Sequence, residues 1–337
     1  MRIRLLLPLS FVFISIIAAL WMTDNTIAYT TPTATPSLTP TAPIIVFSAN
    51  GRPSEMYSDL YGVYQLYVSP YIDHPLTDRD RHYIQPRWSP DGTRIAYTVI
   101  EIEEVTSSRD TIRESAVEIM NADGSNVQVL TAGNGEHAPT WSPDGETIAY
   151  ASRTENAIYL MDADGSNQRM IRDGLEVRSL DFSPDGNQLL VAASIEDAEF
   201  VQPYILSMDG QTLSPLIDGT MSIWDAAWSP DGETIALATT SEGIVLMDVN
   251  EQTREPLTFA GFWSFALEDG FNISDLAWSP DGMQLAFIVQ SWRIQAAVST
   301  PVPIERVGPQ LAVVDLESGE LRLLTYGFHN ADPDWRP

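Results

Sequence analysis

The sequence contains no cysteine. No disulfide framework and no thiolate metal site can therefore form, although a chain of 337 residues can bury a sizeable core without covalent staples. Cationic residues are scarce as well, because 18 Lys and Arg stand against 46 Asp and Glu, for a formal net charge of −28. This charge argues against a nucleic-acid partner, whose phosphates bind Lys and Arg, and it repels anionic lipid surfaces. It favours a self-repelling surface, with affinity for cations as the alternative.

Sequence motifs of catalysis are also lacking. There is no Gly-x-Ser-x-Gly nucleophile elbow and no glycine-rich loop of the phosphate-binding or dinucleotide-binding kind. No window shows a convincing helical period. The sequence therefore predicts an all-β chain that is more a binding protein than an enzyme.

Long apolar runs are confined to the N-terminus. Met1–Arg4 is basic, and residues 5–22 carry no charge. A basic start followed by an apolar stretch is typical of an export signal, and about 20 apolar residues also suffice to span a bilayer. We therefore expect an exported chain, periplasmic or extracellular at the cell surface. Residues 1–28 are then a cleaved signal peptide or a signal anchor, and the membrane is contacted only through residues 5–22.

Residues 29–43 form a segment of different composition. Apart from Tyr29 and Leu38, they are all Thr, Pro, Ala or Ser. Such a segment cannot bury apolar surface, and its prolines favour extended conformations. The composition predicts a Thr/Pro-rich linker that lies outside the folded domain.

A repeated pentapeptide organises the rest of the chain. Trp-Ser-Pro-Asp-Gly occurs four times, a fifth copy has Phe in place of Trp, and a reduced sixth copy ends the sequence. The six aromatic residues are Trp88, Trp141, Phe182, Trp228, Trp278 and Trp335. They are separated by 53, 41, 46, 50 and 57 residues, a period that fits one four-stranded propeller blade per repeat. We expect these aromatic residues to pack between blades.

Each pentapeptide predicts a tight hairpin. Pro presets φ at the first corner, Asp bonds its own backbone, and Gly adopts the left-handed conformation after it. Strand-forming runs surround each hairpin, so that every repeat holds four strands, here called a, b, c and d in chain order. A second turn, as at Asp162–Gly165, indicates a c–d hairpin. It is not expected to be a calcium loop, because the Glu at the twelfth position and the flanking helices are missing.

The two ends of the repeat region are complementary. Residues 44–49, 65–68 and 75–77 resemble strands b, c and d without a strand a, whereas Asp332–Arg336 resembles a strand a with nothing after it. Pairing the two ends completes a blade and hides the edges that an open array would expose. The sequence thus predicts an all-β, six-bladed β-propeller over residues 44–337. Each blade has four antiparallel strands, and N-terminal strands plus a C-terminal inner strand close the ring.

The repeat also resembles a known family. The segments HAPTWSPDGETIAYASR at 137–153 and IYLMDADGSNQRMI at 158–171 look like the WD40-like repeat of TolB-like propellers. They are also similar to the propeller domain of prolyl-oligopeptidase-type proteases, without the hydrolase domain. The resemblance to TolB implies a periplasmic protein that interacts with envelope lipoproteins and other partners. Since a Thr/Pro spacer replaces the separate N-terminal domain of TolB, we expect a monomeric, non-catalytic protein-binding platform at the cell envelope.

Loop lengths indicate which face of the propeller binds. The a–b hairpins are short throughout, whereas the long insertions fall in b–c and d–a loops, which share the opposite face. Aromatic residues, which are enriched at interfaces, occur in these loops: Tyr57, Tyr61, Phe259, Phe262, Trp263, Phe265 and Trp292. We expect either that this loop-rich face binds the partner through them or that they pack beneath their own loops.

The mouth of the central channel is a second candidate site. His82, His137 and His329 lie just before inner strands, and Asp225, Asp275 and Asp332 each lie three residues before a repeat aromatic. Imidazole and carboxylate groups are ligands for divalent cations. Two alternatives stay open: an ordinary polar lining with no cofactor, or a divalent cation site. In the second case the chain is a carbohydrate- or small-ligand-binding propeller, or a metal-dependent lyase or hydrolase.

Overall fold

The structure is a computed structural model. It describes residues 44–50, 61–68, 71–77, 81–101, 114–133, 135–195, 198, 200–217, 221–259, 271–291, 309–325 and 329–337. Residues 42–337 form one compact unit, and the expected signal segment and linker lie outside the described residues. All regular structure in the described residues is β-strand, with no α-helix among them.

The described strands form six four-stranded sheets, here called blades A to F. Blade A contains β1 (Ile44–Asn50), β2 (Tyr61–Val68), β3 (Tyr71–Pro75) and β24 (His329–Trp335). Blade B contains β4 (His82–Trp88), β5 (Arg94–Glu101), β6 (Glu114–Asn121) and β7 (Gln128–Val129). Blade C contains β8 (Glu136–Trp141), β9 (Thr147–Ser152), β10 (Ala157–Asp162) and β11 (Arg169–Arg172).

The other three blades follow the same order. Blade D contains β12 (Leu175–Phe182), β13 (Gln188–Ile195), β14 (Gln202–Ser207) and β15 (Leu213–Pro215). Blade E contains β16 (Ile223–Trp228), β17 (Thr234–Thr239), β18 (Gly243–Asp248) and β19 (Arg254–Pro256). Blade F contains β20 (Phe271–Trp278), β21 (Gln284–Ser291), β22 (Gln310–Asp315) and β23 (Leu321–Leu323).

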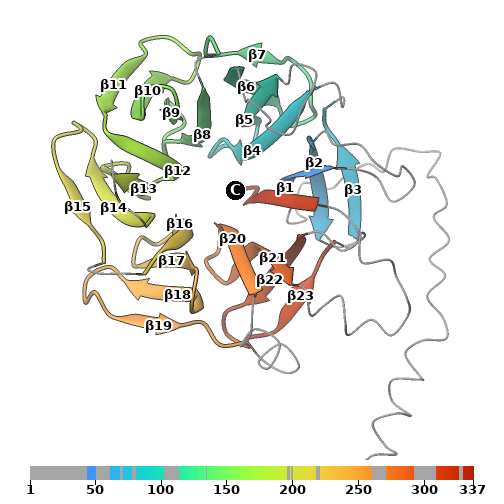
Figure 1. The fold of residues 1–337 in the computed structure, drawn as a ribbon. Coiled ribbons are helices and arrows are strands. Elements are labelled where there is room, and N and C mark those ends of the chain that lie inside the picture. Colours follow the sequence, from blue (N-terminus) through green and yellow to red (C-terminus); the bar gives the residue numbers. More distant parts are fainter. Residues whose placement is uncertain are drawn as a thin grey trace, which may run out of the picture. The chain divides into compact units, whose positions relative to one another are not determined.

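The blades surround a central axis (Figure 1), and their inner strands β4, β8, β12, β16, β20 and β24 contact one another in succession. The prediction of an all-β β-propeller is confirmed. The closing pair is β24 with β1, in which Ile45 lies opposite Trp335 and Val46 opposite Asp334. One residue further on, the N–H of Arg336 donates to the carbonyl of Ile44 at 2.8 Å. The first and last strands of the domain therefore share one sheet.

The a–b hairpins form through the chemistry of their own four residues. In blade C, the Ser142 hydroxyl donates to Asp144 Oδ1 at 2.5 Å, and the N–H of Gly145 donates to the carbonyl of Ser142 at 2.8 Å. Gly145 has a φ of +70°, and a Cβ there would lie 3.6 Å from Cδ of Pro90 in the hairpin of the preceding blade. The positive φ is therefore what favours glycine here, since a Cβ would make only ordinary van der Waals contact with Pro90.

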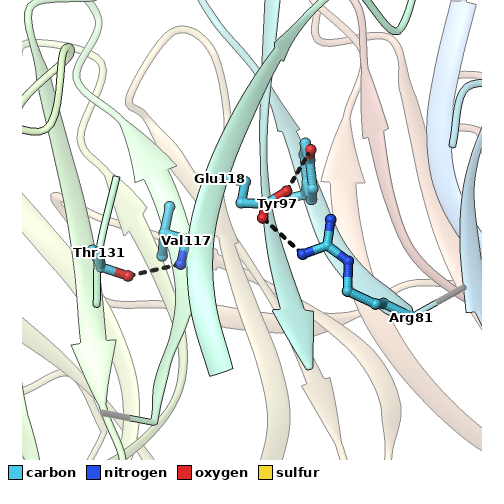
Figure 2. A network of polar contacts seen from close by, with 5 residues as sticks. All are labelled: Arg81, Tyr97, Val117, Glu118 and Thr131. Atoms are coloured by element: carbon cyan, nitrogen blue, oxygen red, sulfur yellow. Dashed lines mark hydrogen bonds and ion pairs between the residues drawn. The ribbon is translucent and has the colours of Figure 1, made fainter. Parts of the chain in front are cut away.

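The outer strands lie about two residues earlier than expected. A strand d was predicted at 75–77, but β3 ends at Pro75, and the corresponding strand of blade B, β7, ends at Val129. In blade B, a side-chain bond replaces the ladder beyond this point. The N–H of Leu130 still donates to the carbonyl of Val117, at 2.9 Å, but the N–H of Val117 donates to the hydroxyl of Thr131 at 2.8 Å (Figure 2).

Six hydrophobic clusters fill the described interior, one at each contact between neighbouring blades. The repeat aromatics lie in or against these clusters. Trp141 Nε1 donates to the carbonyl of Arg87 in the preceding blade at 3.2 Å, and Trp278 and Trp335 make the same bond to Ala227 and Ala277. These three tryptophans are thus both core residues and hydrogen-bonded links between blades, whereas the buried indole N–H groups of Trp88 and Trp228 have no partner among the described residues.

Candidate functional site

Every inner strand is bulged where it passes along the channel. The register shifts in all six pairs of an inner strand with its neighbour. Four residues at or near the bulges have positive φ although they are not glycine: Gln85 at 53°, Ala138 at 51°, Asp275 at 56° and Asp332 at 52°. Such backbone conformations are uncommon and are held by surrounding contacts. In four of the six blades, the position three residues before the aromatic is therefore held in an uncommon backbone conformation.

Side chains at this position bond to the backbone of the next blade. Asp275 Oδ2 accepts the N–H of Asp332 at 3.3 Å, and Asp332 Oδ2 accepts the N–H of Gln85 at 3.0 Å. Gln85 Oε1 in turn accepts the N–H of Ala138 at 2.8 Å. A chain of bonds thus runs from blade F through A and B to C. Asp225 of blade E joins it by accepting the N–H of Leu276 at 2.7 Å.

A second layer of carboxylates lies one residue before the aromatic. Asp334 Oδ2 accepts the N–H of Trp88 at 2.6 Å, and Asp181 Oδ2 accepts the N–H of Trp228 at 2.8 Å. These two bonds, from blade A to B and from D to E, lie on opposite sides of the ring. All five channel aspartates therefore accept a backbone N–H of the following blade.

Arg87 is the cation of this acidic channel. It lies one residue before Trp88, and its guanidinium donates to the carbonyl of Pro86 at 3.0 Å. Together with Asp181, Asp225 and Asp334, it lines a cavity of about 400 Å³ that the hairpin residues border. The described lining thus contains more acidic than basic groups and suits a cationic or hydrogen-bonding ligand.

Burial is the main influence on the pKa values of the charged residues in the channel. Burial raises the pKa of Asp181 to about 7 against the opposing bond from Trp228, and it raises the pKa of Asp334 to about 6 although Arg87 opposes this. The pKa of Asp275 is raised by burial and then by the carboxylates of Asp332 and Asp225. For Arg87, burial disfavours the charge, but Asp334 and the other channel carboxylates outweigh it, so its pKa is raised. The channel therefore retains protons on some carboxyl groups near neutral pH.

Among the histidines predicted for the channel mouth, the structure describes the ring contacts of His137, and the convergence of the three stays a prediction. His137 is buried, and its Nδ1 and Nε2 contact the carbonyls of Gly135 at 3.1 Å and Val177 at 3.0 Å. Burial lowers the pKa of His137 although both carbonyls favour the protonated ring. His82 lies on β4, and His329 lies on β24, where its side chain is outside the description. No group of three or more acidic, His or Cys side chains in the described residues is arranged for a metal ion.

Most aromatics predicted for the loop-rich face lie outside the described residues. This applies to Tyr57, Phe262, Trp263, Phe265 and Trp292, and to the side chain of Tyr61 on β2. Phe259 is described, and its ring packs 6.0 Å from that of Phe287 in the blade core. Phe259 therefore packs against the core of blade F.

One buried polar network has no counterpart in the sequence analysis. Glu118, only 2% exposed, accepts the hydroxyl of the fully buried Tyr97 at 2.9 Å and pairs with Arg81 at 3.0 Å (Figure 2). These residues come from β6, β5 and the segment before β4. Sequence reasoning also missed Arg87, Asp181 and Asp334, each of which lies one residue before a repeat aromatic. Side chains alternate along a strand, so this position faces the channel together with the position three residues before the aromatic.

Comparison with known proteins shows which family and which folds the chain resembles. The model of the TolB beta propeller domain (PD40) matches residues 105–337. Comparison with curated proteins finds no significant match. In the described part of the chain, no helix has the length and apolar character needed to cross a membrane.

Several solved structures share the fold. TolB from Acinetobacter baumannii superposes with a TM-score of 0.65 at 17% identity, over 88% of this chain and 67% of that one. A chain of a nidogen/laminin complex gives 0.60 at 10% identity, over 88% and 98%. Oligogalacturonate lyase in complex with manganese gives 0.50 at 13% identity, over 83% and 72%. At these identities the likeness concerns the fold alone.

Proposed function

Because the chain belongs to the TolB beta propeller domain family, we propose that it is a non-catalytic propeller, exported or tethered at the surface, that binds a protein partner at the cell envelope. One observation carries this proposal. All five channel aspartates, Asp181, Asp225, Asp275, Asp332 and Asp334, accept a backbone N–H of the next blade. Because each of these carboxylates links two neighbouring blades, together they stiffen the ring. A rigid scaffold that presents loops and clefts is suited to binding.

Connection lengths support a partner on the loop-rich face. The connections from β1 to β2, β5 to β6 and β21 to β22 are long b–c loops, and the connection from β19 to β20 is a long d–a loop. In an antiparallel blade these loops emerge at the end opposite the a–b hairpins. The uncharged segment 5–22 supports export, and the net charge of −28 supports a partner with a basic surface.

The experiment is capture of a partner by the purified chain lacking residues 1–28, with photo-crosslinking in envelope extract and mass spectrometry. We expect one protein to be crosslinked repeatedly and to bind the chain when purified. Deleting residues 260–270 should weaken that binding if the partner sits on the loop-rich face. A chain that crosslinks no protein above the level of an unrelated acidic propeller contradicts the proposal.

A second candidate is a small-ligand or metal-dependent function in the channel. The observation in its favour is the cavity of about 400 Å³ lined by Asp181, Asp225 and Asp334. Calorimetric titration with Mn²⁺ and Ca²⁺ tests it, together with the joint replacement of Asp181, Asp225 and Asp334 by Asn. A stoichiometric heat of binding that the triple replacement abolishes in a folded chain favours this candidate. Absence of any heat favours the platform.

A further inference from the structure

The contact between blades C and D differs from the other blade contacts. Phe182 takes the place of the repeat tryptophan, so it has no indole N–H to donate to the preceding blade. At the start of the strand that faces this ring, blade C has Thr147 where blade B has Arg94. This contact therefore has Phe in place of Trp and, compared with the contact between blades B and C, Thr in place of Arg.

The result is a cleft on the hairpin face, with a volume of about 670 Å³. Its apolar lining includes Pro143, Leu160, Met161, Phe182 and Met208. Its polar lining includes Asp144, Asp162, Asp185 and Arg169, beside Thr147, Asn167 and Asn187. The carboxylates outnumber the one cation, so the rim is net acidic.

At two other contacts between blades, an arginine lies over the repeat tryptophan. The guanidinium of Arg94 lies 4.6 Å from the ring centre of Trp141 at the contact between blades B and C. The guanidinium of Arg336 lies 5.3 Å from the ring of Trp88 between blades A and B. No arginine in the described part of the chain stacks on Phe182 in this way. At these two contacts the arginine suits the aromatic, since its planar head stacks on rings and its stem packs on apolar surface.

The rim of the cleft supplies hydrogen-bond acceptors for the guanidinium group of an arginine. The hydroxyl of Ser142 and the N–H of Glu146 both donate to Oδ1 of Asp144, which leaves Oδ2 for a ligand. The hydroxyl of Ser183 holds the pKa of Asp185 down at about 2, and that of Ser142 lowers the pKa of Asp144. Both groups are therefore ionised at neutral pH, when a guanidinium is charged.

We propose that this cleft binds an arginine side chain of a protein partner, whose stem packs along the apolar wall formed by Phe182 and Met208 and whose guanidinium pairs with Asp144. The inference goes beyond the proposed function, which places the partner on the loop-rich face. It adds a recognition point on the hairpin face, at the far end of the blades from the long loops. Arg169 on the rim must move aside or pack beside the incoming stem.

Methionine methyl NMR of the full chain gives a local test, because Met161 and Met208 line the cleft whereas Met283 is exposed on the hairpin of blade F. The probe is an acetylated and amidated Gly-Arg-Gly peptide at up to about 10 mM, a range that detects millimolar dissociation constants. We expect the Met161 and Met208 methyl signals to shift saturably and the Met283 signal to stay. The matching citrulline peptide, which lacks the charge, should leave all three in place.

Two variants distinguish binding in the cleft from a general effect of added positive charge. Thr147→Arg fills the position from within and should weaken peptide binding about tenfold or more. Thr234→Arg adds the same charge at the equivalent position of blade E, where Trp278 is already present, and should bind as the unaltered chain does. Thermal melting confirms that both variants are folded. Equal binding by both variants, or equal loss in both, overturns the proposal, and so does the absence of methyl shifts.

The outcome is distinct from that of the proposed function. A chain that captures an envelope protein but shows no shift at Met161 and Met208 refutes the arginine cleft and leaves the platform standing. A chain whose cleft binds the arginine peptide but captures no envelope protein supports the cleft and contradicts the platform.

Discussion

Asp332 accepts the backbone N–H of Gln85 at 3.0 Å across a sequence separation of 247 residues. The same carboxylate accepts the hydroxyl of Ser48 at 2.9 Å. One side chain on the last strand is therefore bonded to the first strand of its own blade and to the inner strand of the next. The closure of the ring depends on polar contacts inside the channel as well as on the β24–β1 ladder.

Removal of residues 331–337 should destabilise the entire domain. The cut removes Asp332, Asp334 and the buried Trp335, which together join blade A to its neighbours. We expect loss of the cooperative thermal transition in circular dichroism and rapid proteolysis of the whole chain. Removal of Pro337 alone is the control and should leave the transition in place. An unchanged transition after the longer cut would show that the ring closes without its last strand.

Two aspartates four residues apart should respond to pH with opposite signs. Asp181 has a folded pKa of about 7, above its usual value, so its effect on stability becomes less favourable as the pH rises from about 4 to 7. Asp185 has a folded pKa of about 2, so it stabilises above pH 4 and the benefit is lost as the pH falls toward 2. Asp181→Asn should therefore raise the free energy of unfolding at pH 8 relative to pH 5, compared with the unaltered chain.

Asp185→Asn is the matched control in that experiment. It should lower stability at pH 7 and have less effect near pH 2, because the unaltered carboxylate is then being protonated. Urea unfolding from pH 2 to 8, followed by tryptophan fluorescence, measures both variants. The same pH profile for the two variants would contradict the assignment of their environments.

The repeat tryptophans should differ in their contribution to stability. Trp141 Nε1 bonds to Arg87, and its ring is covered by Arg94. The indole N–H of Trp228 is buried and has no partner among the described residues. Trp141→Phe should cost about 1–2 kcal/mol more than Trp228→Phe, from one hydrogen bond and one cation–π contact. Urea unfolding measures the difference, and equal losses would contradict this reading of the contacts.

The buried carboxylate of Glu118 should be critical for blade B. Glu118→Ala leaves the hydroxyl of buried Tyr97 without its acceptor and should cost about 2–4 kcal/mol. Glu118→Gln keeps an acceptor for Tyr97 and should cost less. Glu155→Ala, which removes an exposed carboxylate bonded to Tyr159, is the control and should change stability by less than about 1 kcal/mol. Thermal and urea unfolding rank the three variants, and a neutral Glu118→Ala would contradict the prediction.

The channel shows the limit of prediction from the sequence. Asp225, Asp275 and Asp332 were found because they recur three residues before the aromatic. Their bonds to the next blade were not foreseen, because the bulges that aim them depend on the register between strands. His137 matched a metal-ligand pattern, yet its ring lies between two backbone carbonyls, which only the packing of blades C and D brings together.

The sequence by itself determined the period, the turns and the closure of this propeller. Ser-Pro-Asp-Gly forms its hairpin through bonds within four residues, and the unpaired strand at each end of the domain requires the other. Only the tertiary structure decided which contacts the charged residues make. The pairing of Asp334 with Trp88, the place of Arg87 among carboxylates and the cleft beside Phe182 all arise between blades. Contacts of that kind depend on the distance and orientation of separate sheets, which local sequence does not encode.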